Sequence, residues 1–269
     1  QVMLSLVHGL GPRSNLITVL GGLVPEVLTR GQEPPVPPHL GTTDVDVMLA
    51  VHLAGSEPGY ETLEATMARL GFKADPKVEG WRWLAQVEGH RVKLEFLCDL
   101  NGVAAGLVVR PEGCAFLGAV NLRGSGYAAL DAVEEEIEGP LVDQPGTVRL
   151  RVRFAGLAGY LMAKAHAVVH RGETKDYYDF AYVVIHNKAG GSSAAASAIL
   201  KAFPDVSKLS HIWAELGDRF GTPDRVGPSN YSEQHRMVNP EADPAVLRND
   251  AVAAVSNLVT TIAKGDPVC

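Results

Sequence analysis

Two aspartates separated by a single residue, Asp44 and Asp46, have the spacing best suited to chemistry in this chain. They lie at the start of an apolar run, residues 44–53, that is predicted to be a strand, so their side chains share one face about 7 Å apart. Val45 and Val47 point to the opposite face and can be buried. Neighbouring carboxylates are costly unless water or a cation compensates them. The pair predicts a site for Mg²⁺ or Mn²⁺; the alternative is a half-exposed strand whose polar residues face water.

A glycine pair, Gly21-Gly22, stands where a predicted strand, residues 16–20, meets a helix that begins near Pro25. Such a junction presents backbone N–H groups and the positive end of a helix to an anion. Glycines at turns also serve backbone geometry alone. The pair by itself therefore indicates a phosphate site only in combination with the acids.

A third acid, Glu95, lies in a later predicted strand, residues 91–100, where it shares a face with Lys93. A third carboxylate beside the aspartate pair would complete a metal site. The alternative is a surface acid paired with Lys93 or Arg91. Asp99 lies on the same face about 13 Å further along the strand and is the reserve candidate.

These features together resemble the nucleotidyltransferase superfamily, whose polymerase-β-like fold carries a Gly-Gly or Gly-Ser turn, an Asp-x-Asp strand and a third strand acid. Within it the chain is most similar to the AbiEii/AbiGii-type toxin group, which includes the MenT toxins. The matching segments are Val19-Leu20-Gly21-Gly22 and His39-Leu40-Gly41-Thr42-Thr43-Asp44-Val45-Asp46.

The resemblance implies a metal held by Asp44, Asp46 and Glu95. It also implies that a triphosphate binds at the glycine turn, Gly21 and Gly22, and at the hydroxyls of Thr42 and Thr43. Many relatives carry an arginine four residues before the first acid, where this chain has Leu40. Arg30 or His39 is a candidate replacement for that arginine.

A second cluster follows in a predicted helical region: Lys164, then Arg171, then Lys175, Asp176 and Asp179. Read from the residues alone, these are surface cations and a first-turn acid on a solvated helix end. The pattern is similar to the C-terminal motifs of the same toxin group. That likeness implies that Lys164 reaches the triphosphate and that Asp176 supports the catalytic site. It makes Lys175 and Arg171 candidates for phosphate or RNA contact and Asp179 a structural acid.

The elements that must position these residues are mixed in the first half of the chain and mainly helical in the second. The predicted strands are residues 16–20, 44–53, 81–88, 91–100 and 147–154, with a hairpin turn at Gly89-His90 and more sheet within 102–126. The predicted helices are residues 60–70, 157–170, 176–187, 194–203 and 249–263, with a long loop at 221–240. We expect an α/β (α+β) fold: a nucleotidyltransferase core over residues 1–155, in which helices flank a mixed sheet, and a mainly helical domain over 156–269 that completes the nucleotide site.

Composition narrows the classes of function. With 46 % hydrophobic and 20 % charged residues the chain is an ordinary globular protein, and a net charge of −7 excludes a basic nucleic-acid coat. Three scattered cysteines fit a reducing, cytoplasmic location, and no segment reaches the roughly 18 apolar residues of a membrane span. The stripe Arg149, Arg151 and Arg153 either pairs with the acids of 131–138 or faces RNA.

Two further patterns have simple alternatives. His166 and His170 are four residues apart, a spacing that can bind zinc, but no third ligand is evident. Trp81 and Trp83 share a strand face and are predicted to pack, with base stacking as the alternative.

The resemblance predicts an enzyme that transfers a nucleoside monophosphate from a nucleoside triphosphate to an acceptor such as tRNA. It further suggests the toxin of a toxin–antitoxin or phage-defence pair, with a cognate antitoxin as partner. The alternatives are an antibiotic-modifying nucleotidyltransferase and a non-catalytic nucleotide-binding or interaction module of the same fold.

Overall fold

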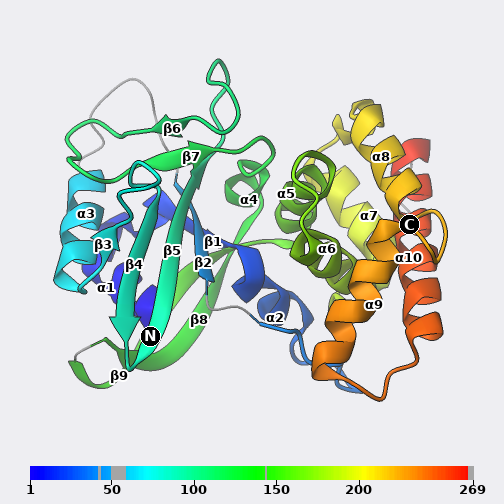
Figure 1. Ribbon diagram of the computed structural model, residues 1–269, viewed down its shortest axis with the longest axis horizontal. Coiled ribbons are helices and arrows are strands. Elements are labelled where there is room, and N and C mark those ends of the chain that lie inside the picture. Colours follow the sequence, from blue (N-terminus) through cyan, green and yellow to red (C-terminus); the bar gives the residue numbers. More distant parts are fainter. Residues whose placement is uncertain (42–43, 50–58, 143, 266–269) are drawn as a thin grey trace. The chain divides into compact units, whose positions relative to one another are not determined.

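The computed structural model describes residues 1–41, 44–49, 59–142 and 144–265, with the backbone alone for strand 44–49. The chain forms two compact units (Figure 1). The first consists of Gln1–Gly22 and Thr42–Ala155, and the second of Leu23–Gly41 and Gly156–Cys269. The protein is therefore mixed α/β, and the segment Leu23–Gly41 packs with the later helices rather than with the strands that flank it in sequence.

One mixed sheet is the framework of the first unit. Its strands lie in the order β3-β4-β5-β2-β1-β9-β8, with β7 paired to both β5 and β6. The central pairs β2–β5 and β1–β9 are parallel, whereas β1–β2, β4–β5 and β8–β9 are antiparallel. The strands are β1 (Ile17–Leu20), β2 (Asp44–Leu49), β3 (Lys73–Ala74), β4 (Arg82–Val87), β5 (His90–Cys98), β6 (Val108–Val109), β7 (Ala119–Asn121), β8 (Ala132–Leu141) and β9 (Gln144–Ala155).

Helices α1 (Val2–Leu10) and α3 (Tyr60–Arg69) pack against each other in this unit. The apolar N-terminal run forms α1 because Leu4 and Leu6 are buried, and α3 buries Leu63 and Met67 at helical spacing. The short helix α4 (Tyr127–Leu130) and the 3₁₀ turn η1 (Gly11–Leu16) complete the unit.

The β4–β5 hairpin confirms two predicted strands but moves their turn by one residue. Glu88 and Gly89, with φ of 50° and 80°, form the turn, and Val87 pairs with His90. Two consecutive positive φ angles match the twist of a two-residue hairpin, which explains why Gly89 stands second and His90 belongs to the strand.

The region 102–126 contains much less sheet than predicted. Only the two residues of β6 and the three of β7 are strand, and loops make up most of the rest. The glycines in this stretch serve turns, for example Gly102 and Gly106 with φ of 84° and 83°.

The second unit is a helical bundle (Figure 1). Helix α5 (Leu157–His170) agrees with its predicted bounds, and α6 (Thr174–His186) begins two residues early. The other elements are α7 (Gly191–Ala202), η3 (Val206–Lys208), α8 (Ser210–Phe220), α9 (Val226–Val238) and α10 (Pro244–Lys264). No helix among the described residues combines the length and apolar character needed to cross a bilayer.

Helix α9 corrects the predicted loop at 221–240. Its turn-forming residues stand at the N-terminal end, where Pro228 costs little because the first-turn N–H groups have no partner within a helix. Tyr231 and His235 lie one turn apart, are about 1 % exposed, and belong to the face of α9 that packs on α6. Burial of that face therefore outweighs the local turn propensity.

The segment Leu23–Gly41 begins with the short helix α2 (Val24–Thr29) and then runs along the bundle. The Lys188 N–H donates to the Leu28 carbonyl at 2.9 Å, and the Tyr182 hydroxyl donates to the Pro37 carbonyl at 2.6 Å. Both contacts join this segment to α6 or to the residues just after it.

Candidate active site

Three adjacent strands bring the predicted metal and phosphate residues of the first unit together. Asp46 has Glu95 of β5 as its Cα partner on one side and Leu20 of β1 on the other. Adjacent strands are about 4.8 Å apart, so Asp46 lies one strand spacing from Glu95 and one from the residue before Gly21-Gly22. The sheet register thus gathers an acid pair and the glycine turn that are far apart in sequence.

The glycine turn has a conformation that favours glycine. Gly21 is buried and has a φ of 78°, which an L side chain rarely adopts. The turn η2 (Gly21–Leu23) leads into α2, which has only six residues and carries Pro25, without an N–H, in its first turn. The candidate phosphate cradle is therefore the turn itself rather than the end of a long helix.

Thr42 and Thr43 lie outside the described residues, as do the side chains of Asp44 and Asp46. The backbone of their strand is placed, and Asp44 has Lys93 as its Cα partner. Carboxylates on adjacent strands are the hard oxygen donors that Mg²⁺ and Mn²⁺ prefer. By chemical type, the residues at this position of the sheet fit a divalent cation.

Glu95 is largely buried, with 14 % of its side chain exposed, and it faces two cations. Arg82 of β4 donates through Nε to Oε1 at 2.7 Å, and Lys93 Nζ lies 3.8 Å from the same oxygen. The predicted pairing with Lys93 is present, and Arg82 is a stronger partner that sequence reasoning did not identify. The predicted turn at Gly89-His90 would have paired Glu95 with Leu84, whereas the turn in the structure makes Arg82 the direct cross-strand partner of Glu95.

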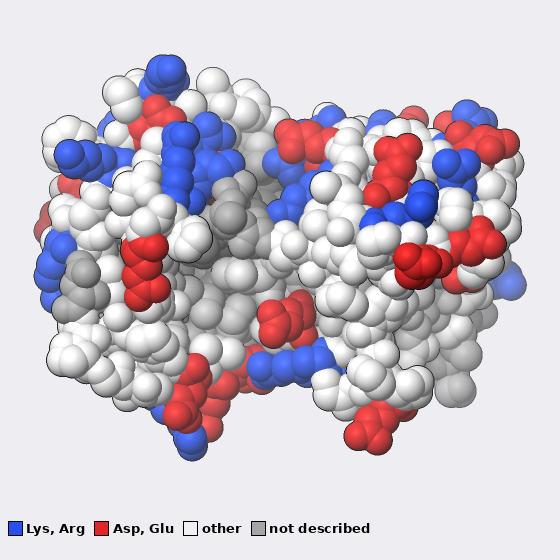
Figure 2. Space-filling view, turned by 60° about the horizontal axis from the view of Figure 1, so that its bottom comes forward, with Lys and Arg blue, Asp and Glu red and all other residues white. Residues whose placement is uncertain are grey.

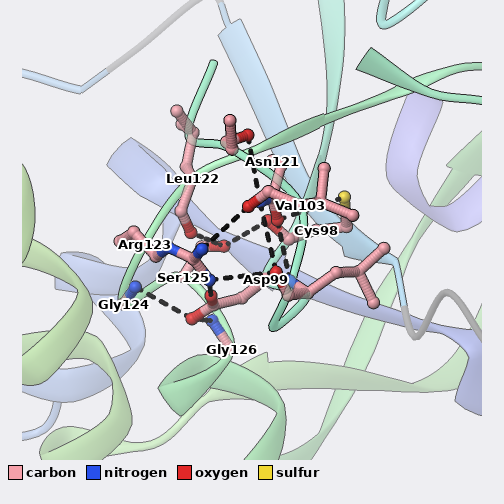
Figure 3. Close-up of polar contacts among 11 residues, drawn as sticks. Cys98, Asp99, Val103, Asn121, Leu122, Arg123, Gly124, Ser125 and Gly126 are labelled. Atoms are coloured by element: carbon pink, nitrogen blue, oxygen red, sulfur yellow. Dashed lines mark hydrogen bonds and ion pairs between the residues drawn. The ribbon is translucent and has the colours of Figure 1, made fainter. Parts of the chain in front are cut away.

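Asp99, the reserve metal candidate, organises a loop instead (Figure 3). Its Oδ2 accepts hydrogen bonds from the N–H groups of Gly124 at 2.8 Å and Gly126 at 3.2 Å. Arg123 lies 3.7 Å from its other oxygen. These contacts occupy both carboxylate oxygens, so we assign Asp99 a structural role.

Asn121, the last residue of β7, fixes the neighbouring loop that follows β5, and sequence reasoning missed it. It is fully buried, its Oδ1 accepts from the Leu100 N–H at 2.7 Å, and its Nδ2 donates to the Val103 carbonyl at 2.9 Å (Figure 3). An amide with both a donor and an acceptor can replace strand ladder bonds in this way. The loop that follows β5 is therefore held by side chains rather than by more sheet.

The predicted second cluster is a buried ion network within the second unit. Lys164 on α5 lies 2.8 Å from an oxygen of Asp179 and 3.2 Å from an oxygen of Asp176. The two acids are one helical turn apart on α6 and are 0 % and 1 % exposed, and Lys164 is 8 % exposed. The alternative of a solvated helix end is therefore wrong for Lys164 and the acids, which are buried, although Arg171 is an exposed cation.

Arg171 also belongs to this network. It donates to Asp176 through Nε at 2.9 Å and through Nη2 at 2.6 Å, a two-pronged arrangement typical of arginine and carboxylate. Lys175, one position before Asp176 on α6, is half-buried and lies about 100° around the helix from it. The network thus consists of Lys164, Arg171, Asp176 and Asp179, and Lys175 lies on another face of the helix.

The charges of the network hold both acids ionised. Burial by itself would raise the pKa of Asp176, but Lys164 and then Arg171 outweigh it and the pKa is lowered. Burial would likewise raise the pKa of Asp179, but Lys164 and His39 lower it to about 2. Lys164 is therefore bound between two carboxylates at neutral pH.

His39 joins the segment before β2 to this network. Its Nδ1 accepts from the Gly41 N–H at 3.1 Å, which leaves the proton on Nε2, and Nε2 donates to Asp179 Oδ1 at 3.0 Å. The ring lies 4.9 Å from the ring of Tyr178, whose hydroxyl accepts from the Leu40 N–H at 3.0 Å. Both imidazole nitrogens are occupied, so His39 does not replace the missing arginine as a phosphate contact.

The arginine stripe of β9 faces the acids of β8. Arg149, Arg151 and Arg153 have Glu138, Glu136 and Glu134 as their cross-strand partners. Arg149 donates to Glu138 at 2.6 and 3.0 Å. On the face shown in Figure 2, Lys and Arg (blue) and Asp and Glu (red) are interspersed. Arg149 is thus paired with an acid of β8, whereas Arg153 donates to the Ala129 carbonyl at 2.9 Å.

Three smaller features of the sequence remain: a histidine pair, a tryptophan pair and Cys98. The rings of His166 and His170 are 5.7 Å apart, and the side chains that the structure describes contain no group of three potential metal ligands. Trp83 is 3 % exposed, as predicted for packing. Burial raises the pKa of the Cys98 thiol to about 12, which makes it unreactive.

No model of a known protein family, no curated protein and no solved structure matches the chain. The geometry of the two units is therefore the basis for assigning a function.

Proposed function

We propose that the protein is a metal-dependent nucleotidyltransferase with a polymerase-β-like core. The observation that carries the proposal is the register of β1, β2 and β5, which places the Gly21-Gly22 turn, Asp46 and Glu95 on adjacent strands. This order of a glycine turn, an acid pair and a third strand acid is the arrangement expected for transfer of a nucleotidyl group.

Each part of the sheet contributes a distinct function. Asp44, Asp46 and Glu95 would hold the cation, Mg²⁺ or Mn²⁺. The turn at Gly21-Gly22 offers backbone N–H groups to the triphosphate. When bound, a divalent ion would neutralise phosphate charge and lower the pKa of an acceptor hydroxyl. Holding acceptor and α-phosphorus in line is the remaining task of the protein.

The second unit supports the narrower assignment to the AbiEii/AbiGii-type toxin group. Lys164 is a charged ammonium group held by Asp176 and Asp179, and we propose that it contacts the triphosphate. Asp176 orients that lysine. On this assignment the acceptor is an RNA such as tRNA, and the natural partner is a cognate antitoxin.

The decisive experiment is transfer of label. The purified protein is incubated with Mg²⁺, each α-labelled nucleoside triphosphate and total RNA, with aminoglycosides and protein as alternative acceptors. We expect label in RNA that disappears in Asp46→Asn and persists in Asp224→Asn, the same change at an exposed acid of the α8–α9 loop.

The other outcomes are equally informative. Label in aminoglycosides but not in RNA would replace the toxin assignment with antibiotic modification. Nucleotide binding with no transfer to any acceptor would contradict the proposal of an enzyme and favour a non-catalytic module.

A further inference from the structure

Arg82 of β4 stands between an aromatic ring and the third acid of the proposed metal site. It is the direct cross-strand partner of Glu95, and its Nε donates to Glu95 Oε1 at 2.7 Å. The guanidinium carbon lies 4.7 Å from the centroid of the Trp81 ring. A guanidinium stacked on an indole loses part of its rotational freedom, so its hydrogen bond to Glu95 has a defined direction.

The turn that carries Trp81 is itself fixed. Gly80 has a φ of 83°, and a Cβ at this position would lie 1.8 Å from the Phe116 carbonyl oxygen, so only glycine fits. The Gly80 carbonyl accepts from the Gly118 N–H at 3.0 Å and from Trp83 Nε1 at 2.8 Å. The Trp81 carbonyl then accepts from the Phe96 N–H at 2.8 Å. Trp81 is thus anchored to β5 beside Glu95.

Both described cations contact the same oxygen of Glu95. Arg82 and Lys93 approach Oε1, at 2.7 and 3.8 Å. A carboxylate whose one oxygen is held by a hydrogen-bond donor presents the other in a defined direction, and such outer contacts commonly orient metal ligands. By register, the neighbour of Glu95 on its other side is Asp46.

We propose that Arg82, stacked on Trp81, is a positioning residue that orients Glu95 toward a divalent cation shared with Asp46. This inference rests on the proposed function, because it assumes that Glu95 is a metal ligand. It assigns to Trp81 a supporting role in the metal site rather than one in stacking on a nucleobase.

The direction in which metal affinity changes when Arg82 is replaced shows whether Arg82 orients Glu95 or acts only through its charge. A positive charge beside a metal site repels the metal, so loss of a purely electrostatic Arg82 would tighten metal binding. Loss of an orienting Arg82 would weaken it, typically by 10-fold or more. Arg82→Gln therefore gives opposite results under the two explanations.

The experiment measures Mn²⁺ binding by electron paramagnetic resonance in the absence of nucleotide. We expect roughly 10-fold weaker binding in Arg82→Gln and a smaller loss in Trp81→Phe, which keeps a ring under the guanidinium. Arg91→Gln makes the same charge change on an exposed residue of β5, four positions before Glu95, and we expect its binding to equal that of the wild type. Thermal unfolding without metal checks that each variant is folded.

Kinetics give an independent readout. In Arg82→Gln the Mg²⁺ concentration for half-maximal transfer should rise by about the same factor, while the KM for the triphosphate at saturating Mg²⁺ stays unchanged. Arg82→Lys should recover only part of the binding, because lysine lacks the planar guanidinium.

Failure of this inference is distinguishable from failure of the proposed function. Unchanged or tighter Mn²⁺ binding in Arg82→Gln, with binding lost in Asp46→Asn, would overturn the role of Arg82 and leave the enzyme assignment intact. Absence of both Mn²⁺ binding and nucleotidyl transfer in the wild type would overturn both.

Discussion

The carboxylates of the sheet and those of the helical bundle differ in burial and in the arrangement of their charged partners. On the sheet, Glu95 keeps 14 % of its side chain exposed, and both contacting cations approach one oxygen. In the bundle, Asp179 has no exposure and lies between Lys164 and His39, which contact different oxygens. The sheet acid is partly open to solvent, whereas the bundle acids are buried among charged partners. The difference teaches that the proposed metal site keeps an acid partly open to solvent, whereas the network in the bundle buries its acids against a lysine and stabilises the fold.

The largest expected effect comes from removing the lysine at the centre of the buried network. Lys164→Met would leave buried carboxylates without their shared cation, and the free energy of unfolding should fall by about 3–5 kcal/mol. Urea denaturation measures the change. Lys175→Met, on the neighbouring face of α6, should change it by less than about 0.5 kcal/mol. Equal losses of stability in Lys164→Met and Lys175→Met would contradict a stabilising role for the buried network.

Acid should destabilise the bundle through neutral, buried histidines. Burial, then the neighbouring His235, lowers the pKa of His186 to about 4. Because the unfolded chain binds a proton at a pKa near 6.5, this stabilisation is present above that pH and is lost as the pH falls toward 4. The loss amounts to at most about 3 kcal/mol.

Urea midpoints between pH 7 and pH 4 measure this dependence. His186→Gln should flatten it, and His211→Gln, at an exposed position, should leave it unchanged. A pH dependence identical in wild type and His186→Gln would contradict the assignment of acid sensitivity to this residue.

A smaller effect is expected from the contact of His39, in the segment Leu23–Gly41, with Asp179 of the buried network. His39→Phe keeps an aromatic ring against Tyr178 but leaves Asp179 Oδ1 without its donor, at a cost of about 1–3 kcal/mol. Denaturant unfolding measures it, with His90→Phe on an exposed hairpin residue as the control. A cost no greater than that of the control would show that the contact does not hold the segment.

The smallest effect on stability is expected at the sheet acid. Glu95→Gln should change the free energy of unfolding by about 0–1 kcal/mol, because its partners are partly exposed. The same substitution should weaken Mn²⁺ binding at least 10-fold. A large loss of stability with unchanged metal binding would reverse the contrast between the two regions.

The sequence predicted elements best where a period repeats. The alternation of β9 and the span of α5 follow from spacing alone, and the structure confirms both. Asp46 and Glu95 could be proposed as neighbours only from a resemblance, because strand order depends on long-range pairing that no local pattern encodes.

The errors arose where tertiary contacts outweigh local preference. Helix α9 contains turn-forming residues, yet burial of Tyr231 and His235 maintains it. The loop that follows β5 contains apolar residues that suggest strands, yet Asn121 and Asp99 organise it through side chains. The pairing of Arg82 with Glu95 was missed because the predicted turn at Gly89-His90 would place Leu84 opposite Glu95. The turn at Glu88-Gly89 shifts the register, and Arg82 becomes the partner of Glu95.

The packing of the segment Leu23–Gly41 on the later helices has a consequence for biosynthesis. Leu28 is translated 160 residues before Lys188, whose N–H it binds, a delay of roughly ten to thirty seconds at ribosomal speed. Throughout that time Val24, Val27 and Leu28, all buried in the finished protein, lack the helices that cover them. The nascent chain therefore carries an apolar stretch that stays uncovered until α6 (Thr174–His186), which packs against α2, has been synthesised.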